Sequence, residues 1–214
     1  VAWRGVVVDG GTFDWMANDK FPTLSQPYAG FHDLVFAEEF GPQAFITRAR
    51  KEGIRDFGAC MAPMTAFQIL QGLETLPLRM QRHVSNALAV AEFLQEHPMV
   101  ESVSHPGLSS HPDFELAKQI LPLGAGAVFS FELRGGREAG RVLIESLELF
   151  SHLANVGDAK SLVIHPASTT HHRVEEQALR AAGIGPGLVR LSVGLEDPKD
   201  LLSDLKGALR AVEK

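Results

Sequence analysis

Two stretches in the last third of the chain decide the fold: Asn155-Val-Gly-Asp-Ala-Lys-Ser-Leu-Val-Ile-His165 and Gly187-Leu-Val-Arg-Leu-Ser-Val-Gly194. Each contains an apolar run that is typical of a strand and is bordered by small polar residues. The second run places Arg190 among Leu, Val and Ser. A guanidinium stays charged and carries five donors, so it needs partners, and a planar carboxylate fits it best. That carboxylate belongs either to a buried Asp or Glu of the protein or to a substrate.

Two further polar residues precede Arg190 on the other stretch. Ser161 lies at the start of its strand-like run, and Asn155 lies in the loop before it. If the two strands are neighbours, Arg190, Ser161 and the backbone near Asn155 converge on one small carboxylate. The sequence therefore predicts a carboxylate site here, although spacing alone does not show that the strands pair.

The chain from residue 99 onward alternates short strands and helices, which predicts a small α+β or α/β layered domain. Strands are expected at 100–103, 127–133, around 153–164 and at 188–193, and helices at 113–121, 138–150 and 174–182. A last helix begins with Asp197 as N-cap and Pro198 in its first position.

The earlier part of the chain is predicted to hold a strand at 5–8, a helix over 34–52 closed by Gly53, and a helix over 63–73. A long helix over 76–96 follows, and the domain boundary is placed on it. Because a strand already runs at the first residues, we expect the chain to be part of a longer protein.

Composition excludes several classes of function. The 214 residues carry a net charge of -6 without a basic stripe, which argues against nucleic acid or an anionic membrane as a partner. No apolar run approaches the length of a membrane span. The single cysteine, Cys60, lies among small apolar residues, which predicts a buried thiol and suits a cytoplasmic location.

The motifs of several kinds of catalytic site are missing. His165, His171 and His172 lie close together, but no His-Glu-x-x-His or Cys-x-x-Cys pattern accompanies the nine histidines, so we expect no metal site. The sequence contains no Gly-x-Ser-x-Gly motif, so it does not predict a serine nucleophile of that kind. The glycines at 183–187 precede a strand, whereas a phosphate loop follows one.

The run from Ser151 to His171 resembles the Cys/Met-metabolism family of pyridoxal-phosphate (PLP) enzymes. Arg190-Leu-Ser-Val-Gly-Leu-Glu-Asp197, Gly72-Leu-Glu-Thr-Leu-Pro-Leu-Arg-Met80 and the His105-Pro-Gly-Leu motif resemble the same family. The resemblance covers essentially the whole chain and points to the sulfhydrylase branch.

This resemblance implies an α/β fold, the fold-type I PLP-dependent transferase. Residues 1–75 would be the end of the large PLP-binding domain, 76–96 a bridging helix and 97–214 the small C-terminal domain. Arg190 would bind the substrate's α-carboxylate, with Ser161 and the Asn155 backbone alongside. The Schiff-base lysine and the other cofactor-binding residues would lie upstream, so this stretch alone would be inactive, with no catalytic residue and no cofactor contact of its own.

The implied reaction is γ-replacement on O-acetyl-L-homoserine by sulfide or a small thiol, giving homocysteine or methionine plus acetate. The implied partners are the amino-acid substrate, the thiol, the N-terminal half and further copies in a homodimer or homotetramer. Two alternatives remain open. One is another family member, a methionine γ-lyase or cystathionine γ-synthase, and the other is an inactive fragment that acts as an interaction module.

Overall fold

A computed structural model describes residues 6–171 and 173–214. The chain divides into two compact units, Val1–Glu74 and Thr75–Lys214. The division falls at the start of the long helix α5 (Leu76–Gln95), which belongs to the second unit. The assignment of the first unit to a PLP-binding domain stays a prediction.

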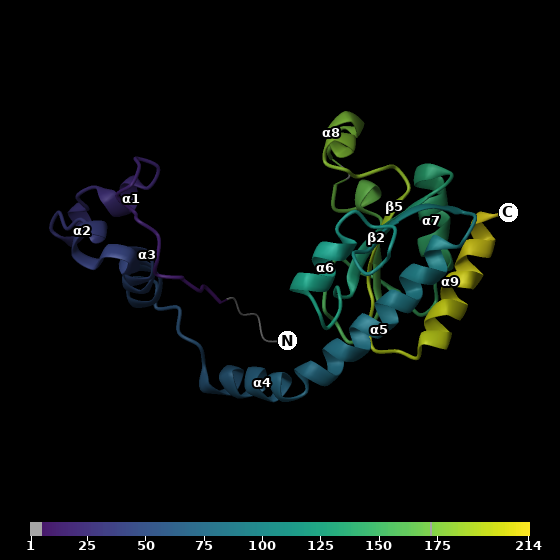
Figure 1. Ribbon diagram of the computed structural model, residues 1–214, viewed down its shortest axis with the longest axis horizontal. Helices are drawn as coiled ribbons and strands as arrows, with labels where there is room; N and C mark the ends of the chain where they lie inside the picture. The colour runs from purple at the N-terminus through teal and green to yellow at the C-terminus, as the bar shows by residue number, and fades with distance from the viewer. Residues whose placement is uncertain (1–5, 172) are drawn as a thin grey trace. The chain divides into compact units, whose positions relative to one another are not determined.

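The second unit combines one sheet with helices (Figure 1). After α5, its elements are β1 (Val100–Ser104), α6 (Phe114–Ile120), β2 (Val128–Leu133), α7 (Gly136–Ser146), β3 (Ser151–His152), β4 (Leu162–Ile164), the 3-10 turn η4 (Pro166–Ser168), α8 (Glu176–Ala181), β5 (Leu188–Ser192) and α9 (Pro198–Val212). The predicted elements of this half are confirmed, with ends that differ by a few residues.

The five strands lie in the order β1-β2-β5-β4-β3. All neighbours are antiparallel except β3 and β4. The strand β5 therefore lies in the middle of the sheet, between β2 and β4. This pairing confirms that the two stretches holding Arg190 and Ser161 are neighbours.

One face of the sheet carries the core of this unit. Alternate residues of β2 and β5 are apolar and fully buried, because they pack against α5, α7 and α9. In Figure 1, α5 and α9 run side by side along this layer. Leu201, Leu205 and Leu209 line the inner side of α9, at the spacing that places residues on one face of a helix.

The predicted cap of α9 is confirmed, because the backbone N–H of Lys199 donates to Asp197 Oδ1 at 2.8 Å. Replacing Asp197 with alanine should lower the free energy of unfolding by about 1 kcal/mol, since one N–H at the helix start loses its acceptor. Urea unfolding followed by circular dichroism measures this loss. Asp197→Asn keeps the acceptor and is the control; an equal loss in both variants would contradict the capping role.

The named elements in the described part of the first unit are all helices. Its elements are α1 (Pro22–Ser25), η1 (Ala29–Phe31), α2 (Phe36–Phe40), η2 (Gly41–Gln43), α3 (Ala44–Arg48), the π-helix η3 (Ala49–Asp56) and α4 (Pro63–Glu74). A small core forms around Phe36 and Ala44. Beside it, the Arg48 guanidinium lies 4.2 Å from the centre of the Tyr28 ring and pairs with Glu52 at 2.9 Å.

Four predictions for the first unit are wrong. Residues 6–8 are irregular and exposed instead of a strand, because no other strand pairs with them among the described residues, and residue 5 lies outside that part. The 34–52 helix is interrupted at Gly41, whose φ of 51° does not fit a right-handed helix. Gly53 does not end the helical run, which continues to Asp56. Cys60 is exposed.

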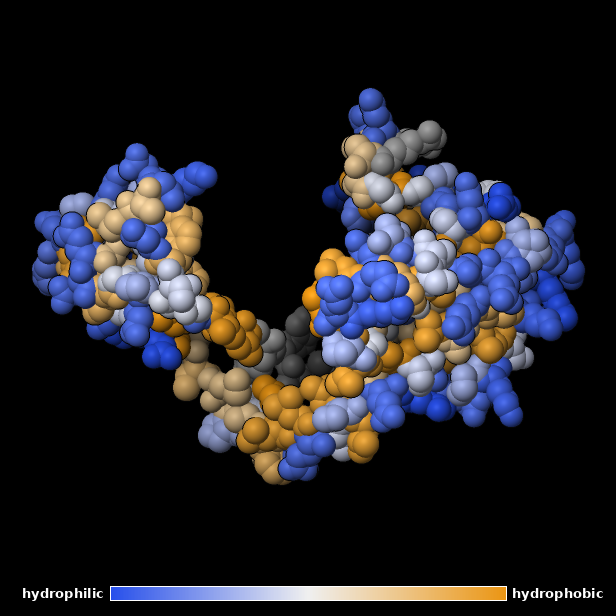
Figure 2. All heavy atoms as spheres, viewed as in Figure 1, coloured by the Kyte–Doolittle hydropathy of each residue, from blue (hydrophilic) through white to orange (hydrophobic). Residues whose placement is uncertain are grey.

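The helix α4 confirms the prediction for 63–73 but has an unusual surface. None of its residues is buried, and Met64, Phe67 and Leu70 are each more than half exposed. In Figure 2, apolar side chains gather over this helix. Contiguous exposed apolar surface is typical of regions that a partner covers. No helix in the described part of the chain is both long and apolar enough to cross a membrane.

Candidate functional site

Arg190 lies on the face of the sheet opposite the core helices. It pairs with Ser130 on β2 and with Ile164 on β4, so these three side chains point to the same face. The neighbouring residues Val189 and Leu191 point the other way and are fully buried in the core. The strand thereby holds the half-buried Arg190 in place by the packing of its neighbours.

The polar contacts of Arg190 leave most of its donors free for another group. Its Nη2 donates to the backbone oxygen of Asn155 at 3.4 Å, a long hydrogen bond. Among the side chains that the structure describes, no carboxylate forms an ion pair with Arg190. The first of the two carboxylate sources, an acidic residue of the protein, is thus not found there.

The loop between β3 and β4 is fastened to β5 next to Arg190. The N–H of Gly157 donates to the hydroxyl of Ser192 at 3.1 Å, and Ser192 is almost fully buried. Ser192 and Arg190 are two residues apart on the same face, so β5 contacts the loop at both Asn155 and Gly157. The structure therefore brings Asn155 and Arg190 together, as predicted.

Ser161 lies at the other end of this loop, with its side chain fully buried. Its hydroxyl donates to Glu196 Oε2 at 2.9 Å and accepts from the N–H of Gly194 at 2.8 Å, while its own N–H donates to Glu196 Oε1 at 2.6 Å. The single hydroxyl proton is already used within the protein. Ser161 thus connects the loop to the turn after β5, and its place beside a substrate carboxylate stays a prediction.

Residues of α5 hold this turn from the opposite side. The buried Asn86 donates to the backbone oxygens of Gly194 and Glu196 at 3.0 and 2.9 Å. The buried His83 bonds through Nδ1 to the oxygen of Val193 at 2.7 Å. The sequence did not indicate Asn86, His83 or Glu196, because their partners lie far away along the chain. For Asn86 and His83, a polar residue on the buried side of α5 is a signal that could have indicated a role.

Replacing Glu196 with alanine should destabilise the second unit by about 1–3 kcal/mol, because the buried N–H and O–H of Ser161 both lose their acceptor. Denaturant unfolding measures the change. Glu196→Gln keeps one acceptor oxygen and should cost less. If alanine and glutamine cost the same, the carboxylate does not hold Ser161 in the way described.

The histidines near this site do not form a metal centre in the described part of the chain, where no three His, Cys, Asp or Glu residues come together. His165 is buried, and its two ring nitrogens bond to Ser168 Oγ and to the backbone oxygen of Pro186, each at 2.8 Å. Burial lowers the pKa of His165, which favours a neutral ring. His171 is exposed, and His172 lies outside the described residues.

No lysine of the chain has the setting of a cofactor-bearing residue. A Schiff-base lysine is usually desolvated in a pocket so that its amine can lose its proton. All seven lysines are exposed: Lys20, Lys51, Lys118, Lys160, Lys199, Lys206 and Lys214. The described residues therefore fit a role in binding a substrate carboxylate but not the covalent attachment of PLP.

The model of the Cys/Met metabolism PLP-dependent enzyme family matches residues 2–210. The chain belongs to this family. The predicted resemblance is confirmed, and the Cys/Met metabolism family is PLP-dependent. The match extends through both units, so it covers the loop of Asn155, the strand of Arg190 and the helix α4 alike.

Two curated relatives are close in sequence. The chain is 50% identical to the O-acetyl-L-homoserine sulfhydrylase of Leptospira meyeri, over 97% of this chain and 49% of the relative. It is 48% identical to the homocysteine synthase of Schizosaccharomyces pombe, over 96% of this chain and 48% of the relative. The chain thus spans about half the length of the curated relatives it matches.

A solved structure confirms the fold. It is the crystal structure of a putative O-acetylhomoserine (thiol)-lyase from Campylobacter jejuni, which contains a pyridoxyl-lysine. The TM-score is 0.79 at 40% identity, covering 91% of this chain and 46% of the other. The α/β fold of the PLP-dependent Cys/Met metabolism enzymes is therefore confirmed for this chain.

Proposed function

We propose that this chain supplies the substrate-carboxylate site of a PLP-dependent enzyme that performs γ-replacement on O-acetyl-L-homoserine. Sulfide or a small thiol would replace acetate, giving homocysteine or methionine. The observation that carries the proposal is Arg190, a half-buried cation without an acidic partner among the described side chains. The names of the sulfhydrylase and synthase relatives support the choice of substrate.

In this proposal Arg190 binds the α-carboxylate of the amino acid. The guanidinium can donate two parallel hydrogen bonds to a carboxylate, which fixes the orientation of the substrate as well as its position. A fixed orientation matters because a reacting bond must be aligned with the group that activates it. The oxygen of Asn155 holds one edge of the guanidinium and leaves the remaining donors for the substrate.

Ser161 takes part in the proposed site through the loop that it anchors. Its contacts to Glu196 and Gly194 fix one end of the loop, and Ser192 fixes the middle. The position of the Asn155 oxygen beside Arg190 depends on both. PLP, when bound, would supply an electron sink for the reaction, and its attachment would require a lysine other than the seven exposed ones.

We also propose that the active protein is a cytoplasmic homodimer or homotetramer in which a further N-terminal part accompanies this stretch. The exposed apolar side chains of α4 support a protein partner for that helix. The exposure of every lysine favours a second candidate function, in which the chain alone is an inactive interaction module.

The test of the proposed function is a substrate comparison with the intact enzyme. Purified enzyme loaded with PLP is assayed with O-acetylhomoserine plus sulfide, with methionine alone, and with O-acetylhomoserine plus cysteine. The highest kcat/KM is expected with sulfide. Methionine cleavage as the main activity would indicate a methionine γ-lyase, and cysteine as the best acceptor would indicate a cystathionine γ-synthase. Activity in none of the assays would favour the interaction module.

A further inference from the structure

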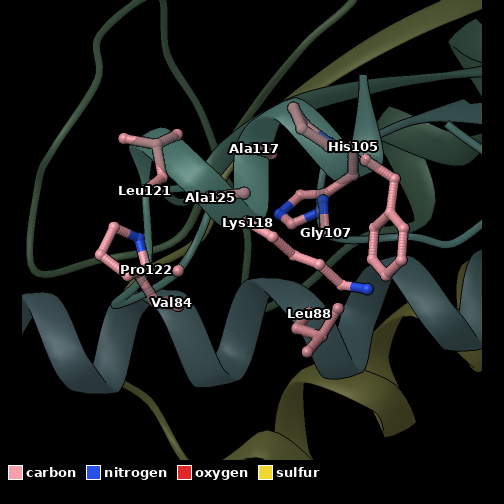
Figure 3. A pocket seen from close by; sticks show the side chains of 12 residues that line it. Val84, Leu88, His105, Gly107, Ala117, Lys118, Leu121, Pro122 and Ala125 are labelled. Atoms are coloured by element: carbon pink, nitrogen blue, oxygen red, sulfur yellow. The ribbon is translucent and has the colours of Figure 1, made fainter. Parts of the chain in front are cut away.

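A cavity of about 280 Å³ lies in the second unit between α5, the turn after β1, and α6. Figure 3 shows the side chains around it, with the ring of His105 among them. Its volume exceeds that of a cavity able to hold benzene, which is roughly 150 Å³. The walls are mainly apolar and include Val84, Leu88, Phe114, Ala117, Leu121 and Pro122.

His105 is the one buried polar side chain among the residues that line this cavity, with 1% of its surface exposed. The N–H of Gly107 donates to its Nδ1 at 3.0 Å. Its ring also meets the Phe129 ring edge-on, with centroids 5.3 Å apart. Both contacts fix the ring, and the first makes Nδ1 the acceptor nitrogen.

The other ring nitrogen is then a donor without an acceptor. Burial lowers the pKa of His105, which favours the neutral ring, and the Gly107 contact leaves the ring proton to Nε2. The Gly126 backbone opposes this pKa shift, but by geometry the buried Nε2 has no hydrogen-bond partner in the described part of the chain. Buried donors are nearly always paired, so an unpaired one in a cavity wall indicates a missing group.

We propose that this cavity binds a small, uncharged, apolar molecule with one oxygen that accepts a hydrogen bond from His105 Nε2. A ketone or an ether of about the size of a substituted benzene has this chemistry. The site is separate from that of Arg190 and does not depend on the proposed function. It would make the small domain a binding site for a second ligand.

An anionic ligand fits less well. The cation on the cavity wall, Lys118, already pairs with Glu115 at 3.1 Å and lies 4.1 Å from the centre of the Phe114 ring. A carboxylate in the cavity would lose its hydration and meet only a neutral donor, which is unfavourable. A neutral oxygen has a much smaller hydration to lose.

The experiment compares two probes of nearly equal shape, acetophenone and α-methylstyrene. The second probe has a C=CH₂ group where acetophenone has its C=O group, so it cannot accept the hydrogen bond. The full chain, labelled with ¹⁵N at histidine, is titrated with each probe, and the His105 Nε2 signal is followed by NMR. Acetophenone should bind about three- to tenfold more tightly, the range expected for one net hydrogen bond. It alone should shift the Nε2 signal strongly.

Two variants and one control make the site assignment falsifiable. His105→Phe removes the donor and should abolish the preference for acetophenone, whereas His111→Phe, at a histidine outside the cavity wall, should keep it. Ala117→Leu keeps His105 and should prevent both probes from binding, because it fills the cavity. Three results would overturn the proposal: equal affinity of the two probes for the unaltered chain, unchanged binding in Ala117→Leu, or no binding of either probe. If neither probe binds, the cavity holds water only.

Discussion

Replacing Arg190 with alanine is expected to lower kcat/KM of the intact enzyme for its amino-acid substrate by roughly ten- to a hundredfold. The reason is the loss of charge-assisted hydrogen bonds to the carboxylate, which contribute about 1.5–3 kcal/mol. Most of the change should appear as a higher KM, because Arg190 contacts a group that does not react. Steady-state kinetics over a range of O-acetylhomoserine concentrations measures it.

Arg190→Lys is the matched variant for this prediction. Lysine keeps the positive charge but lacks the planar fork, so it should restore only part of the lost affinity. Lys160→Ala, in the same loop region but exposed, is the control and should leave KM unchanged. An Arg190→Ala enzyme with unaltered KM and kcat would remove the carboxylate assignment.

Replacing Leu205 with alanine is expected to lower the free energy of unfolding of the second unit by about 2–5 kcal/mol. Leu205 has no exposed surface and packs in the core between α9 and the sheet. Its truncation would leave a cavity that rigid neighbours fill only in part. Guanidinium unfolding monitored by circular dichroism measures the loss.

Leu202→Ala provides the comparison on the same helix. Leu202 is only partly buried against the core, so the same truncation there should cost distinctly less. Equal losses at both positions would mean that α9 does not present its predicted inner side to the sheet.

The second unit could be predicted well because its patterns are local. The strand at 127–133 and the Asp197-Pro198 start of the last helix each depend on a few neighbouring residues, and both are confirmed. The first unit was predicted less well, since a strand at 5–8 needs a pairing partner and Gly53 alone does not end a helix.

The candidate site divides in the same way. Arg190 was found from its own strand, because a cation in an apolar run conflicts with its surroundings. The residues that anchor the loop between β3 and β4 could not be predicted, because Glu196 and Asn86 form hydrogen bonds with residues that only the folded chain brings near. The contacts that anchor Ser161 depend on the same partners, so they could not be predicted from the local sequence either.

The most direct test of the Arg190 assignment is a crystal structure of the intact enzyme with an unreactive analogue of O-acetylhomoserine that keeps the α-carboxylate. Both carboxylate oxygens are expected at about 2.7–2.9 Å from guanidinium nitrogens of Arg190, as in a charge-assisted pair. The Asn155 oxygen should remain on the other edge of the guanidinium. A carboxylate bound elsewhere, with Arg190 bonded only to the protein, would contradict the account.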